Sequence, residues 1–322
     1  MEYVIGILIN RYDWLWVITA AIIAERLLPI PAAYHPRLFI RNMAQRLQQK
    51  VLVPSRSPSQ QTMAGVLAAL MMLLFVAPLP ILAHEFAPYP MVVDTLLLML
   101  CLQWQPMKQQ LTRFANTNHQ QKQLKRTLLS PWLARDCGAL SELGLNKGAV
   151  EAIYLRSFTD QVGILFWYVI AGIYGALGYW LLLELSRQWH PRLRKQHYFG
   201  SPLKQLRALL DVLPQSVWAL WLALSSGGPW SQQHLALVGQ FRSKARALVL
   251  VAASKRLGCE LGGPAMYQQR KFRQPRLAAN RPPQASDVIT SFQQVNWHLQ
   301  LLLSLIWAGI VSHTFWVVFA GI

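Results

Sequence analysis

The chain has 322 residues, of which 53% are hydrophobic and only 14% charged, and its formal net charge is +18. Soluble domains carry about 25% charged residues, so this composition excludes an ordinary water-soluble protein. Because helices satisfy their own backbone hydrogen bonds in lipid, we expect an all-α, polytopic integral membrane protein. Its cations lie between the apolar runs, a pattern typical of loops that stay cytoplasmic and meet anionic lipid. We therefore expect a lipid bilayer and no nucleic acid as partner.

Apolar runs that reach or approach the length of a membrane crossing mark the expected membrane segments. In chain order, these segments are 14–31, 62–83, 91–105, 162–185, part of 209–226, and 301–322. A crossing takes roughly 20 residues, so we expect about four to six membrane segments within a single domain, 1–322. A bacterial inner membrane, with the basic loops mainly cytoplasmic, is the expected location.

The segments between these runs have their own character. Residues 37–52 place apolar side chains largely on one helical face and arginines on the other, which predicts an amphipathic helix on the membrane surface. Residues 106–160 are polar and predominantly helical in pattern. Residues 261–285 are rich in Gly, Pro and Arg and lack periodicity, which predicts a loop.

The charge pattern conflicts with a simple crossing of segment 162–185. Residues 106–160 contain eight Lys or Arg against four acids, and residues 186–208 contain six Lys or Arg and no acid. A single crossing would place these two basic segments on opposite sides, against the usual distribution of positive charge. Two glycines, Gly172 and Gly175, occupy the centre of the run. We therefore expect this segment to enter the membrane and return as two half-helices.

Few residues suggest chemistry. The sequence contains no Walker-type loop, HExxH motif, CxxC pair or GxSxG elbow. Four acids, Asp136, Glu142, Glu151 and Asp160, fall in one stretch. Glu142, Glu151 and Asp160 follow one another at intervals of nine positions. On a helix this spacing alternates between opposite faces, so these three acids form no single carboxylate cluster. They are candidates for a magnesium site or simply hydrated helix faces, and no metal ligand set can be assigned.

Short motifs occur in the order found in one known family. The main ones are Arg135-Asp136-Cys137, Leu140-Ser141-Glu142, Val150-Glu151-Ala152, Leu165-Phe166-Trp167, Gly175-Ala176-Leu177-Gly178-Tyr179 and Leu261-Gly262-Gly263-Pro264, with His35-Pro36 near the start. In these motifs the sequence resembles the CobD/CbiB family, the adenosylcobinamide-phosphate synthases of cobalamin biosynthesis. That resemblance covers nearly the whole chain and implies an integral membrane protein.

The resemblance also implies a reaction and a site. The reaction is ATP-dependent attachment of aminopropanol, or its phosphate, to cobyric acid, with ATP and Mg²⁺ as cofactors and a corrinoid as substrate. The implied catalytic residues are Asp136, Glu142, Glu151 and Asp160, and the implied substrate- or phosphate-binding residues are Arg135, Arg156 and His35. The polar signature is eroded, because the family's Glu-Asn pair falls on Leu155 and Arg156 and its Asp-Gly pair on Thr159 and Asp160.

Two alternatives stay open. The first is a non-catalytic regulatory or binding protein similar to the AmpE proteins, membrane modulators that look like distant relatives of the family. The loss of polar signature residues favours this alternative. The second is a transporter or corrinoid-binding component, suggested by the basic loops and by His313 in the last apolar run.

Overall fold

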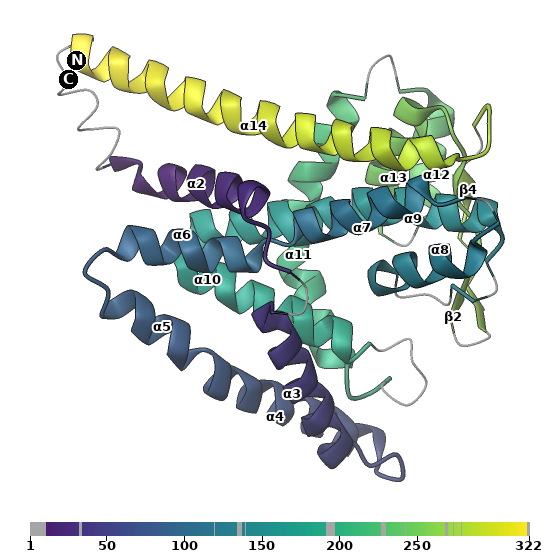
Figure 1. Cartoon of the computed structure of the whole chain (residues 1–322), viewed down its shortest axis with the longest axis horizontal. Helices are drawn as coiled ribbons and strands as arrows, with labels where there is room; N and C mark the ends of the chain where they lie inside the picture. The colour runs from purple at the N-terminus through teal and green to yellow at the C-terminus, as the bar shows by residue number, and fades with distance from the viewer. Residues whose placement is uncertain are drawn as a thin grey trace.

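The computed structural model describes residues 11–31, 34–118, 120–133, 137–138, 140–190, 197–226, 230–241, 243–267, 270–272, 274–277 and 279–320. These residues are almost entirely helical (Figure 1). The helices before the central segment are α2 (Asp13–Leu27), α3 (Pro36–Val51), α4 (Pro58–Val76), α5 (Pro78–Glu85), α6 (Pro90–Cys101), α7 (Trp104–Asn116), α8 (Lys122–Leu129) and a 3₁₀ turn, η1 (Ser130–Trp132). The remaining helices are α9 (Glu142–Ser157), a π-helical turn η2 (Phe158–Val162), α10 (Gly163–Gln188), α11 (Ser201–Leu224), α12 (Gln232–Gln240), α13 (Lys244–Leu257) and α14 (Ala285–Ala320).

Three stretches of the described chain are helical, long and apolar enough to cross a membrane: Pro58–Glu85, Glu142–Gln188 and Ala285–Val318. They confirm the class of all-α membrane protein. The expected segments 14–31 and 91–105 are shorter than anticipated, because α2 has 15 residues and α6 has 12. At about 1.5 Å per residue these helices are roughly 22 and 18 Å long, less than the ~30 Å hydrocarbon core.

The segment 162–185 turns back on itself. Gly172 has φ 60° and ψ −155°, and this conformation interrupts α10. Asp160 and Arg187 form an ion pair although 27 positions separate them, whereas a straight helix would hold them roughly 40 Å apart. The two halves of α10 therefore run back along each other, and both basic segments flanking α10 start from the same end of this hairpin. The conflict in the charge pattern disappears with this turn.

The tip of the α10 hairpin meets the connection between α5 and α6. The Tyr174 hydroxyl donates a hydrogen bond to Glu85, and its ring lies 5.4 Å from the ring of His84. His84 Nδ1 in turn lies 2.6 Å from an oxygen of Asp94 on α6. Two helical hairpins, α4–α5–α6 and α10, thus end at the same level of the molecule.

Two apolar cores lie on either side of η2. One core involves α7, α8, α9, α11, α13 and the start of α14, and the other involves α2, α3, α4, α6 and α10. In Figure 1, α3, α4 and α5 lie at one end of the molecule and α8, α12 and α13 lie at the other. The polar turn η2 therefore sits at the junction of the two cores, where ionisable side chains are taken out of water.

The segment 261–285 is more regular than predicted. Strands β1 (Leu261–Gly262) and β4 (Arg276–Leu277) pair antiparallel, and so do β2 (Ala265–Tyr267) and β3 (Arg270–Phe272). These strands are too short to show a period-two pattern, so composition alone indicated a loop. The predicted helical character of 106–160 is confirmed by α7, α8 and α9.

Candidate functional site

Five charged residues form what we call the junction network: Arg41, Arg156, Asp160, Glu184 and Arg187. Arg156 lies in the last turn of α9, and Asp160 follows in the π-helical turn. Glu184 and Arg187 lie at the end of α10, and Arg41 projects from α3. Single π-helical turns inside helices recur at functional sites, because the wider turn re-aims side chains and frees backbone groups.

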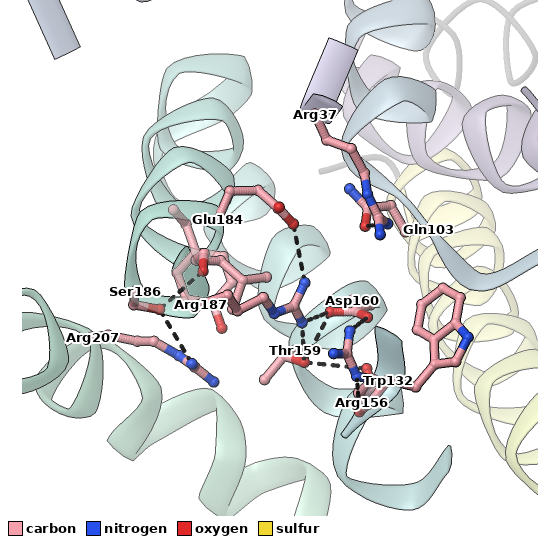
Figure 2. Close-up of polar contacts among 12 residues, drawn as sticks. Arg37, Gln103, Trp132, Arg156, Thr159, Asp160, Glu184, Ser186, Arg187 and Arg207 are labelled. Atoms are coloured by element: carbon pink, nitrogen blue, oxygen red, sulfur yellow. Dashed lines mark hydrogen bonds and ion pairs between the residues drawn. The ribbon is translucent and has the colours of Figure 1, made fainter. Parts of the chain in front are cut away.

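Arg187 connects the two carboxylates of this network (Figure 2). It forms an ion pair with Asp160 and lies 3.1 Å from Glu184. Asp160 forms a second ion pair with Arg156, with an N–O distance of 3.2 Å. Glu184 forms a second ion pair with Arg41, with an N–O distance of 2.7 Å. The Asp160 and Glu184 side chains are 1% and 0% exposed. Charges so deeply buried require paired, hydrogen-bonded partners, and each carboxylate has two.

A further arginine adds uncompensated positive charge beside the network. Arg37, on the buried face of α3, donates a hydrogen bond to Gln103, and no carboxylate of the described residues pairs with it. The Arg37 and Arg156 guanidinium carbons lie 5.7 and 5.1 Å from the centre of the Trp132 ring. Burial, and then the charge of Arg41, lower the pKa of Arg37 to about 10, which leaves it protonated at neutral pH.

The charge balance favours an anionic ligand. Four arginines, Arg37 and the three of the network, face two carboxylates. Guanidinium groups bind carboxylates and phosphates through paired N–H donors. The arrangement therefore provides a partly buried cationic surface, with the Trp132 ring close to two guanidinium groups, that suits a carboxylate or phosphate group.

The structure separates the acids that the sequence analysis grouped. Asp160 lies in the junction network with Arg156, whereas Glu142 is paired with Lys125 at 3.0 Å. Glu151 accepts a hydrogen bond of 2.8 Å from the backbone N–H of Gly262. These three acids therefore have three different sets of partners. Two further predicted residues, Arg135 and Asp136, lie outside the described residues.

The described part of the chain offers no ligand set that can be assigned to a magnesium ion. Among the described residues there is no group of three or more His, Cys, Asp or Glu side chains that could hold a metal. Magnesium sites use one or two carboxylates together with water and substrate phosphates. In the junction network, arginine N–H groups already occupy oxygens of both Asp160 and Glu184.

His35 begins α3 close to this network. Its Nδ1 accepts a hydrogen bond of 3.2 Å from the backbone N–H of Arg37, which makes it the N-cap of the helix. The residue is 5% exposed. Burial, with the adjacent Arg37 charge, lowers the pKa of His35 to about 4, while Glu184 and the backbone of Leu100 oppose this shift. His35 is therefore a neutral hydrogen-bond acceptor at physiological pH.

Stability should consequently fall as the pH drops from about 6.5 to about 4. Over this window the unfolded chain binds a proton at His35 and the folded chain does not, so acid favours unfolding. We expect His35→Asn, which retains a capping side chain, to reduce the loss by on the order of 2–3 kcal/mol. Unfolding of both proteins in detergent at a series of pH values measures the difference. Equal pH slopes for the two proteins would contradict this assignment.

The sequence analysis missed Arg37, Arg41, Glu184 and Arg187. Glu184 had a usable signal, because an acid inside the apolar run 173–186 is costly unless it has a partner or a function. Arg187, three positions later on the same helical face, was the natural partner. The contacts to α3 depend on the tertiary fold and had no local signal.

The fold and the site together define a helical membrane protein with a buried, arginine-rich polar site at the junction of two cores. A model of the CobD/Cbib protein family matches residues 18–295. The chain therefore belongs to the CobD/CbiB family of cobalamin biosynthesis proteins.

Curated relatives support this membership. The chain is 28% identical over 195 residues to the cobalamin biosynthesis protein CobD of Stutzerimonas stutzeri, a match that covers 59% of each chain. It is 25% identical to the protein of the same name from Chromobacterium violaceum, over 88% of this chain and 93% of that one. A probable CobD of Pyrococcus furiosus is 34% identical over 32% of this chain and 36% of its own length. No solved structure matches.

Proposed function

We propose that this protein acts in cobalamin biosynthesis by attaching aminopropanol, or its phosphate, to a carboxylate of cobyric acid. The reaction forms an amide bond between the carboxyl carbon and the amine, and the displaced carboxylate oxygen leaves on a phosphate released when a phosphoanhydride bond of ATP is cleaved. The protein would act in the bacterial inner membrane. The observation that carries it is the surplus of arginine over carboxylate around Trp132, in a chain of this family.

Cobyric acid, ATP and the phosphate of aminopropanol each carry an anionic group that the arginines can hold. Amide formation requires a carboxylate whose charge resists attack by an amine, so neutralising and orienting that group promotes the reaction. Arg37 would receive the carboxylate or a phosphate, since its guanidinium has no carboxylate partner among the described residues. Arg156 would act beside it, with its own orientation fixed by Asp160. Magnesium would accompany ATP, with no ligands assigned to it among the described residues.

The test is complementation. A strain without its own cobinamide-forming enzyme, supplied with cobyric acid, would express this chain, and corrinoid products would be measured by mass spectrometry. We expect cobinamide or its phosphate. Arg37→Gln should lower product formation by about tenfold or more, because a hydrogen bond to a charged group contributes about 1.5–3 kcal/mol. Arg113→Gln, on the exposed face of α7, is the matched control and should retain activity.

A second candidate is a non-catalytic membrane protein that binds an anionic ligand or a regulatory partner. The observation that favours it is that every predicted acid within the described residues already has a partner: Lys125, the Gly262 N–H, or two arginines. A well-expressed, membrane-inserted wild-type chain that forms no product would favour this candidate. Product formation would exclude it.

A further inference from the structure

A groove of about 400 Å³ lies between α3 and α4. It lies outside the junction network, since none of the five network residues lines it. Its volume falls within the ~300–1,000 Å³ range of small-molecule sites. The groove therefore has room for part of a ligand, and its lining indicates which chemical class fits.

The α3 wall of the groove has two parallel stripes. Phe39, Met43 and Leu47 follow one another at intervals of four residues and form an apolar stripe. Asn42, Arg46 and Lys50 follow the same interval and form a polar stripe beside it. A ligand in this groove would contact apolar carbon along one stripe and two cations along the other.

The α4 wall is apolar and belongs to a membrane-crossing stretch. Met71 and Phe75 line the groove and remain 46% and 65% exposed. They lie within Pro58–Glu85, which is long and apolar enough to cross a membrane. Because exposed apolar side chains on such a helix face acyl chains, the groove opens toward lipid rather than toward water.

The positive charge of the groove favours an anionic ligand. Neither Arg46 nor Lys50 forms an ion pair with a carboxylate of the described chain. The sequence from 35 to 60 carries further cations and no Asp or Glu. Cations immediately beside a membrane segment attract anionic lipid, each contributing about 1 kcal/mol near the surface.

The lining of the groove changes from cationic at one end to apolar at the other, as a phospholipid changes from its headgroup to its acyl chains. Lys50 stands next to Val51, where α3 ends, at the short connection to Pro58. Phe75 lies 17 residues after Pro58, roughly 25 Å further along α4. The cationic end thus lies at the helix connection and the apolar end lies deeper along the membrane helix. A headgroup phosphate at one end and an acyl chain toward the other match this gradient.

We propose that the groove between α3 and α4 binds an anionic phospholipid of the surrounding bilayer. Its phosphate lies on Arg46 and Lys50, and one acyl chain follows Phe39, Met71 and Phe75. This inference does not depend on the proposed function, because none of its residues belongs to the junction network.

Native mass spectrometry of the full chain in detergent, titrated with lipid, tests the proposal. Phosphatidylglycerol and phosphatidylcholine with the same acyl chains would be compared. We expect preferential retention of phosphatidylglycerol, weakened about tenfold or more in the double variant R46Q/K50Q. The matched double variant R113Q/K122Q removes two exposed cations from α7 and α8 and should change the affinity by less than about twofold, since it leaves the local charge intact.

The acyl contact has its own pair of variants. M71A/F75A should weaken phosphatidylglycerol binding, whereas L67A/L74A, which removes exposed α4 side chains outside the groove, should not.

Glycerol 3-phosphate should fail to displace the lipid. Equal retention of the two lipids, or equal effects of the two cation variants, would overturn the proposal. Displacement by glycerol 3-phosphate at lipid-like concentrations would overturn it too, because a free phosphate would then be the ligand class.

Discussion

Replacing Arg187 with methionine is expected to lower the free energy of unfolding by about 3–5 kcal/mol, the usual cost of removing one partner from a buried ion pair. Arg187 faces two buried carboxylates, Asp160 and Glu184, and supplies N–H donors to both. Without it, each carboxylate keeps a single arginine, and the ion pair that links Asp160 of η2 to the end of α10 is lost. Denaturant unfolding in detergent, followed by tryptophan fluorescence, measures the loss.

The controls for Arg187 separate charge from geometry. Arg187→Lys keeps the charge but cannot reach two carboxylates with a planar, forked donor set, so we expect an intermediate loss. Arg113→Met removes an arginine from an exposed position of α7 and should change stability by less than about 0.5 kcal/mol. A loss for Arg187→Met no larger than that for Arg113→Met would show that the network does not stabilise the fold.

Replacing Gly172 with alanine is expected to destabilise the hairpin by about 1–3 kcal/mol, since its backbone conformation is nearly exclusive to glycine. With φ 60° and ψ −155° it lies where a Cβ strains the backbone. No atom lies within 4 Å of the position that the new methyl group would occupy, so steric crowding by neighbours contributes nothing. The measurement is the shift of the unfolding midpoint relative to wild type.

The matched variant is Gly178→Ala, in the second half of α10. Its added methyl group also has no neighbour within 4 Å, and its backbone lacks a positive φ. Alanine within a helix is more stable than glycine by roughly 0.5–1 kcal/mol, so this variant should be neutral or slightly stabilising. Equal destabilisation by the two substitutions would mean that the turn at Gly172 is not required for the fold.

Sequence patterns predicted the helical class well because apolar runs and basic loops report membrane structure locally. They overestimated the lengths of α2 and α6. Pro29 and Pro31 follow α2, and the residue before a proline is disfavoured in helical conformation, so α2 ends at Leu27. The apolar pattern of the sequence continues to residue 31, whereas the helix ends at Leu27.

The candidate site was only half predictable. Asp160 and Arg156 stood out because they are ionisable residues at the start of an apolar run, four positions apart, and the structure pairs them. The contacts of Arg187 with Asp160 and of Arg41 with Glu184 depend on the reversal at Gly172 and on the packing of α3 against α10. Those contacts join residues 27 and 143 positions apart, and no local periodicity encodes such distances.

The reversal of α10 also bears on how the ribosome-bound chain enters the bilayer. No lysine or arginine occurs from residue 57 to 107, from 163 to 186, or after 281. Neither hairpin, up to the tips that meet at Tyr174 and Glu85, therefore brings a lysine or arginine into the bilayer. Moving one cation outward against a negative-inside potential of 100 mV costs about 2.3 kcal/mol. Because both arms of a hairpin return to the side from which they enter, the basic segments that flank α10 avoid this cost if the hairpin inserts as a unit.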